Sequence, residues 1–63
     1  MTGKQAIKLL QRHNWVILRM SGSHCRMGKY HLRTTVPIHG KKDIGIGLLK
    51  AIDKQTGVKL YEN

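Results

Sequence analysis

The sequence has few of the residues that stabilise small domains by covalent links or large aromatic cores. Its 63 residues include one cysteine, one proline and no phenylalanine. A single cysteine cannot form an internal disulfide, and the histidines and cysteine lack the paired spacing of a structural zinc site. We therefore expect one small domain over residues 1–63, with an aliphatic core, no metal or cofactor, and a reducing cytoplasmic setting.

Acidic residues and long apolar runs are scarce as well. Three acidic residues stand against twelve Lys and Arg, which gives a net charge of +9. Self-repulsion of this size favours a polyanionic partner, and nucleic acid fits best. The basic residues are spread along the chain instead of lining one amphipathic helix, which argues against membrane binding. Lys4, Lys8 and Arg12 interrupt the first apolar positions, so neither a signal peptide nor a transmembrane helix is expected.

Two helices are predicted, one near each end of the chain. Thr2 is suited to cap the first, which ends near His13, where Asn14 tolerates a left-handed conformation. The second runs from about residue 46 to residue 56 and ends at Gly57. Helical spacing gives the expected buried residues: Ala6, Ile7, Leu10 and in part Leu9, then Leu48, Leu49 and Ile52. The final tail is expected to dock through Leu60 and Tyr61.

Three antiparallel strands are predicted between the helices. Residues 15–21 and 24–29 form a hairpin, because glycine at the first position of the Gly22-Ser23 loop suits a type II′ turn. The expected pairs are Ser21 with His24, Met20 with Cys25, and Arg19 with Arg26. Residues 32–39 form the third strand, which Pro37 places at the sheet edge. Alternation predicts these inward side chains: Val16, Leu18, Met20, Cys25, Met27, Thr34, Val36 and Ile38.

The order of these elements predicts a two-layer α+β fold. A three-stranded antiparallel sheet carries both helices on one face, and its other face is open to solvent. His24, Arg19 and Arg26 are predicted on that open face. Two arginines directly opposite each other repel unless an anion such as phosphate lies between them. An imidazole beside a bound phosphate can accept a proton from a ribose 2′-hydroxyl or donate one to a leaving oxygen. From spacing alone, however, the favoured reading of His24 is a polar residue of a solvated strand.

Several segments resemble the HicA toxins of prokaryotic HicA/HicB toxin–antitoxin pairs. The matching residues are Trp15-Val16-Ile17-Leu18-Arg19, Gly22-Ser23-His24, Thr35-Val36-Pro37-Ile38-His39-Gly40, and Leu49, Ile52, Lys54-Gln55 and Gly57. The resemblance covers nearly the whole chain. It implies a fold similar to the double-stranded RNA-binding domain, ribonuclease activity on mRNA, and a catalytic histidine that falls on His24. It also implies a HicB-like antitoxin that covers the active face. Where many members have a second histidine directly after the catalytic one, this chain has Cys25.

Other residues have two readings. Ser23 could bind a phosphate oxygen or serve only the turn, and Lys41 and Lys42 could anchor phosphates or lie in a solvated loop. His39 could be a second acid or base, or could hold a phosphate or a structural hydrogen bond. Cys25 is expected to be a buried thiol, because neighbouring strand residues point to opposite faces and it cannot form a dyad with His24. Trp15 and Tyr30 could stack on bases, although Trp15 is expected to complete the core instead.

Two functions remain in competition at this stage. The leading hypothesis is a metal-independent endoribonuclease in which His24 moves the proton and the 2′-hydroxyl attacks the adjacent phosphorus. The alternative is a non-catalytic RNA-binding module or small ribosomal component, which the same fold and charge would serve. We expect the free protein to be a monomer.

Overall fold

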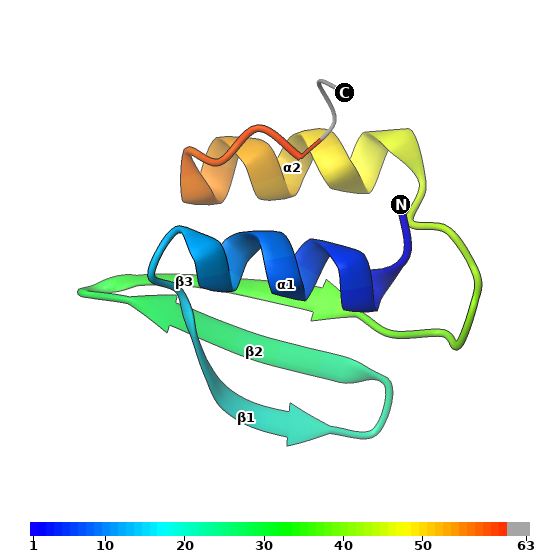
Figure 1. Cartoon of the computed structure of the whole chain (residues 1–63), viewed down its shortest axis with the longest axis horizontal. Helices are drawn as coiled ribbons and strands as arrows, with labels where there is room; N and C mark the ends of the chain where they lie inside the picture. Colours follow the sequence, from blue (N-terminus) through cyan, green and yellow to red (C-terminus); the bar gives the residue numbers. More distant parts are fainter. Residues whose placement is uncertain (61–63) are drawn as a thin grey trace.

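The computed structural model describes residues 1–60 of the chain. It contains α1 (Gly3–Arg12), β1 (Val16–Ser21), β2 (His24–Lys29), β3 (Leu32–Pro37) and α2 (Ile46–Thr56). The strands form one antiparallel sheet in the order β1-β2-β3, and both helices lie on one side of it (Figure 1). The predicted α+β fold and its element order are confirmed. We call the helix-covered face of the sheet the inner face and the opposite one the outer face.

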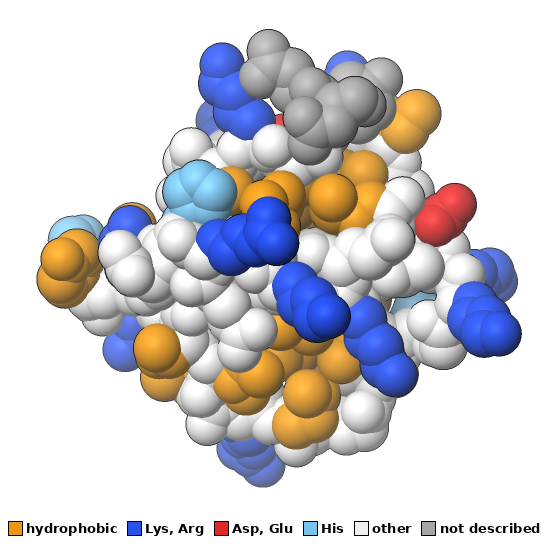
Figure 2. All heavy atoms as spheres, in the orientation of Figure 1, with side chains coloured by type: hydrophobic (Ala, Val, Ile, Leu, Met, Phe, Trp, Pro, Cys, Tyr) orange, Lys and Arg blue, Asp and Glu red, His pale blue; other side chains and the backbone are white. Residues whose placement is uncertain are grey.

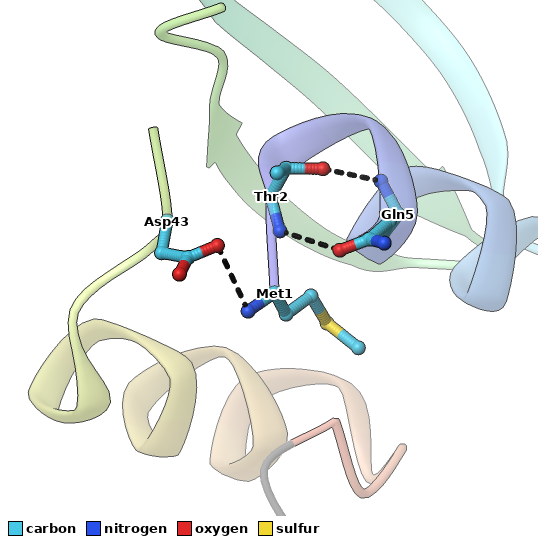
Figure 3. Close-up of polar contacts among 4 residues, drawn as sticks. All are labelled: Met1, Thr2, Gln5 and Asp43. Atoms are coloured by element: carbon cyan, nitrogen blue, oxygen red, sulfur yellow. Dashed lines mark hydrogen bonds and ion pairs between the residues drawn. The ribbon is translucent and has the colours of Figure 1, made fainter. Parts of the chain in front are cut away.

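The start of α1 is tied to the segment that enters α2 (Figure 3). The Thr2 side chain accepts a hydrogen bond from the Gln5 amide at 3.3 Å, and the Gln5 side chain accepts one from the Thr2 amide at 2.9 Å. This reciprocal capping box confirms Thr2 as the cap. The Met1 ammonium lies 3.3 Å from the Asp43 carboxylate, and the Ile44 amide donates to the Met1 carbonyl at 2.8 Å. These contacts hold the loop between β3 and α2 in place.

The core lies between the helices and the inner face. α1 buries Ala6, Ile7 and Leu10, and α2 buries Leu49 and Ile52, as predicted. The sheet contributes Cys25, Met27, Thr34 and Val36. The Thr34 hydroxyl donates to the Gln55 side chain of α2 at 2.8 Å, so this buried polar group is satisfied. The prediction for Leu48 was wrong, because its side chain is 43% exposed on the outer side of α2.

The turns follow the predicted chemistry. Asn14, which follows the C-cap residue His13 of α1, has φ 69°, and Gly57 ends α2 at φ 76°. Gly22 has φ 57°, the positive value that a type II′ turn needs at its first position. Beyond α2, Leu60 is buried as expected, while Tyr61 falls outside the described residues.

The prediction of a buried face on β1 was wrong. Val16, Leu18 and Met20 are 55%, 49% and 53% exposed. The predicted pairs near the turn are present, but the register shifts between Ile17 and Arg19, where a bulge adds one residue to β1. The bulge reverses the alternation, so that Val16 pairs with Gly28 and turns to the outer face with Leu18. Met20 stays on the inner face, but β1 lies beyond the cover of the helices (Figure 1).

The third strand is shorter than predicted. It ends at Pro37 instead of residue 39, which leaves Ile38 half-buried and His39 exposed after the strand. β3 is an edge strand, as Pro37 predicted, because β2 is its one neighbour within the described sheet. Directly after β3, the amide of Ile38 donates to the Ser23 carbonyl at 2.6 Å, which ties the end of the strand to the first hairpin loop.

Candidate functional site

His24 is the first residue of β2 and follows the tight Gly22-Ser23 turn. It pairs with Ser21 on one side and Pro37 on the other, and its side chain is exposed. Even-numbered residues of β2 face away from the helices, since Cys25 and Met27 are fully buried on the inner face. The imidazole therefore stands in solvent on the outer face, as predicted.

Two arginines lie next to this histidine on the outer face. Arg19 and Arg26 are direct partners across β1 and β2, and both are exposed. Arg26 is two residues from His24 on the same strand, about 7 Å along it. Its guanidinium donates to the Thr35 hydroxyl of β3 at 2.9 Å. Thr35 therefore orients one of the two cations, a role that follows from the strand register and that the sequence interpretation missed.

The electrostatics of this region favour an anion. Like charges at directly opposite strand positions repel, by about 0.2 to 1 kcal/mol. The carboxylate of Asp43 pairs with the amino terminus and not with the two arginines. A phosphate close to Arg19, Arg26 and His24 would relieve the repulsion and accept hydrogen bonds from both guanidinium groups.

Ser23, Lys41 and Lys42 lie at the same end of the sheet as His24. Ser23 is half-buried, and its carbonyl accepts the bond from the Ile38 amide described above. Both lysines are exposed in the loop that leaves the sheet at Pro37, the strand partner of His24. The Lys42 amide donates to the His39 carbonyl at 3.0 Å, so this loop contains a turn. His39 is also exposed here, but beyond the strand on which its outward orientation had been predicted.

Further cations extend the positive surface beyond the predicted site. Lys4, Lys8 and Arg12 are exposed at four-residue intervals on α1, and Figure 2 shows Lys and Arg side chains along that helix. Lys29 and Arg33 lie at the other end of the sheet from His24. Helical spacing could have identified the first row. The second group needs the strand register, because its two members are joined only through the β2–β3 pairing.

The cysteine next to His24 belongs to the core. Cys25 is fully buried on the inner face, and burial raises the pKa of its thiol. A thiol with a raised pKa is a poor nucleophile at neutral pH. The neighbouring His24 ring also points to the opposite face of the sheet. The dyad is therefore excluded, as predicted. Trp15 is 1% exposed and completes the core, whereas Tyr30 is 87% exposed.

The raised thiol pKa predicts a specific pH dependence of stability. The folded chain binds the Cys25 proton more tightly than the unfolded chain, so this stabilisation is complete below the ordinary thiol pKa and is lost as pH rises from that value through the raised pKa of the folded chain. We expect the free energy of unfolding to fall more steeply above about pH 8.5 in the parent than in Cys25→Ala. Urea denaturation at each pH measures both slopes. Equal slopes would show that the thiol proton is held no more tightly in the folded chain.

The comparisons with known proteins bear directly on this arrangement. The family model described as the HicA toxin of bacterial toxin–antitoxin systems matches residues 3–58, from the first residue of α1 to beyond α2. The chain belongs to the HicA toxin family. This HicA-type chain is thus the toxin of a toxin–antitoxin system and has an antitoxin as partner. The curated proteins and the solved structures gave no match.

Two further observations describe what residues 1–60 contain. No helix among them is long and apolar enough to cross a bilayer. They also hold no cluster of three or more His, Cys, Asp or Glu side chains that could bind a metal ion.

Proposed function

We propose that this HicA-type toxin is an endoribonuclease that cleaves mRNA without a metal ion, with His24 as the general acid or base. The observation that carries the proposal is the exposed His24 imidazole on the outer face beside the paired Arg19 and Arg26. A proton-transfer group and two phosphate-binding groups thus share one open surface. The family match supports the same reading, because a toxin needs a cellular target.

The proposed reaction is an internal phosphoryl transfer. The ribose 2′-oxygen attacks the adjacent phosphorus, and the bond from phosphorus to the 5′-oxygen of the next nucleotide breaks. His24 either takes the proton from the 2′-hydroxyl or gives one to the departing 5′-oxygen, and solvent completes the balance. One product ends in a 2′,3′-cyclic phosphate and the other begins with a 5′-hydroxyl. A positioned proton-transfer group of this kind contributes about 100- to 10,000-fold in rate.

The remaining predicted residues hold the RNA backbone in this proposal. Arg19 and Arg26 bind the scissile phosphate and stabilise the charge that develops on it. Lys41 and Lys42 bind phosphates farther along the strand, and Ser23 offers its hydroxyl at the turn beside His24. These contacts are to the backbone, so they set affinity and salt dependence and carry no sequence preference.

The antitoxin is proposed to be a HicB-like protein that covers the outer face. An inhibitor of this kind would need acidic groups to match a chain of net charge +9 and would bury the His24 ring. We propose that the free toxin is a monomer. Because the substrate is mRNA and the lone cysteine forms no internal disulfide, we further propose that the toxin acts in the cytoplasm.

The ends of the cleaved RNA test the proposed reaction. Purified toxin is incubated with a labelled RNA in excess chelator, and then with the same RNA carrying a single 2′-deoxy nucleotide at a mapped cleavage position. We expect cleavage to persist in chelator, to leave cyclic phosphate ends, and to disappear only at the 2′-deoxy position. Cleavage that needs added metal or leaves 3′-hydroxyl ends would overturn the mechanism. RNA that is bound but stays intact would favour the non-catalytic RNA-binding module.

A further inference from the structure

A second surface on the outer face has the features of a nucleobase site. It is an open groove of 290 Å³ at the far end of the sheet from His24, with β1, β2 and the β2–β3 turn around it. His24 and Lys29 are the two ends of β2, so roughly 17 Å of strand separates the catalytic end from the groove. The two sites therefore lie on one continuous face.

The wall of the groove is apolar and belongs to β1. Val16 and Leu18 line it, and they are the side chains that the bulge turned out of the expected core. The missing side chain of Gly28 leaves room for this wall. A Cβ at that position would lie 2.7 Å from the Leu18 Cδ1 atom and 2.9 Å from the Arg33 Nη1 atom. Leu18 and Arg33 thus converge over the backbone of β2 from opposite sides.

The rim of the groove carries an exposed aromatic ring on a strained backbone. Tyr30 is the first residue of the two-residue turn between β2 and β3, and its φ is 54°. Bulky residues rarely adopt positive φ, because the side chain crowds the backbone, and glycine would relieve that crowding. The ring is 87% exposed, so burial does not offset the strain. Strained residues of this kind concentrate at ligand-binding positions.

A fixed cation stands beside the aromatic ring. Arg33 lies across the hairpin from Gly28 and shares the outer face with Leu18. The Arg33 guanidinium donates to the carbonyls of Tyr30 and Leu32 at 2.9 and 2.7 Å, which fixes its plane over the groove. An apolar wall, an aromatic ring and fixed positive charge are the elements with which proteins bind single-stranded nucleic acid.

We propose that this groove binds one unpaired base of the RNA strand that is cut at His24. The base stacks on Tyr30 and contacts Leu18, and the adjoining phosphate lies near Arg33. The inference rests on the proposed ribonuclease function and specifies its substrate as single-stranded RNA. A base within a duplex is stacked on both of its faces and paired along one edge, so it cannot enter the groove.

Binding measurements test the groove apart from catalysis. The toxin carries His24→Ala so that the probe stays intact, and the probe is a short fluorescent single-stranded RNA of mixed sequence. We expect Tyr30→Gly to weaken its binding about 5- to 150-fold, the range for loss of one base stack. Because glycine accepts positive φ, the urea midpoint of Tyr30→Gly is expected to stay equal or rise. His31→Ala, at the next exposed position of the same turn, is the matched control and should bind normally.

A probe with abasic nucleotides completes a double-mutant cycle between Tyr30 and the base of the RNA. It should bind the Tyr30 protein more weakly than the normal probe, and Tyr30→Gly should not weaken it further. Equal binding of normal and abasic probes, or of single strand and duplex, would overturn the base site. Unchanged RNA binding with weakened antitoxin binding would assign the groove to protein contact and overturn it too. If RNA binds as expected but the parent toxin leaves it uncut, the proposed cleavage fails while the base site stands.

Discussion

Replacing His24 with alanine is expected to lower kcat/KM for RNA cleavage about 100- to 10,000-fold. An imidazole is the type of side chain that suits proton transfer, whereas the guanidinium groups of Arg19 and Arg26 offer only hydrogen-bond donors and no acceptor. The affinity for RNA should change little, because the backbone contacts come from the arginines and lysines. Cleavage of a labelled RNA and equilibrium binding to the same RNA give the two numbers.

A matched histidine substitution guards this result against trivial causes. His13 ends α1, where its ring bonds the Leu9 carbonyl at 3.0 Å, away from the proposed site. His13→Ala removes the same group and should keep nearly full activity. Because His24 is exposed, its loss should alter the free energy of unfolding by less than about 0.5 kcal/mol. Equal cleavage by His24→Ala and the parent would remove this residue from the chemistry.

Replacing Trp15 with alanine is expected to remove a large part of the stability of the fold at 25 °C. Trp15 is the largest fully buried side chain, and removal of such a group costs about 3 to 5 kcal/mol. A domain of 63 residues has a total stability of only about 3 to 9 kcal/mol. The residue also joins two elements, because its amide donates to the Leu10 carbonyl of α1 at 3.1 Å directly before β1. Circular dichroism during urea denaturation measures the loss.

The comparison with Trp15→Phe separates the apolar contacts of the Trp15 ring from any contribution of its indole nitrogen. The indole nitrogen is buried and has no hydrogen-bond partner among the described residues. The contribution of Trp15 to stability is therefore expected to come from the apolar contacts of its ring. Phenylalanine should retain most of the stability, with a loss well below that of alanine. A loss in Trp15→Phe as large as in Trp15→Ala would mean that the nitrogen itself carries the stabilisation.

The fold was largely predictable because its signals are local. Thr2 and Gly57 mark helix ends through capping chemistry, and Gly22 with Ser23 sets the first hairpin. That hairpin then determines that Arg19 lies opposite Arg26. The candidate site was predictable to the same extent, since the position of His24 depends only on the turn before it and on the two-residue period of a strand.

The errors arose where position in the whole fold matters more than local pattern. Residues 16–20 alternate like a half-buried strand, yet β1 lies beyond the helices and carries a bulge. No local sequence pattern predicts either feature, because both depend on how many strands the helices can cover. Figure 2 shows the consequence as apolar side chains exposed over the lower part of the molecule, below α1.

The base groove could not be predicted from the sequence for the same reason. Its members come from β1, β2 and the second turn, and they meet only after the bulge turns Leu18 outward over Gly28. Base stacking was one possible role of Tyr30 in the sequence, but its position on the rim was not predictable, since an aromatic residue is not expected at positive φ. The exposed apolar residues of β1 gain a role from this position: they form one wall of a surface whose other wall is cationic.

The central claim is that the His24 ring moves a proton during cleavage, and its titration tests this most directly. The ring protons of His24 can be followed by NMR across pH in the free toxin, and kcat/KM can be measured over the same range. We predict that kcat/KM changes at the midpoint where His24 titrates, because this parameter reports the ionisation of the free enzyme's essential groups. A cleavage rate that stays constant through the His24 titration would contradict the claim.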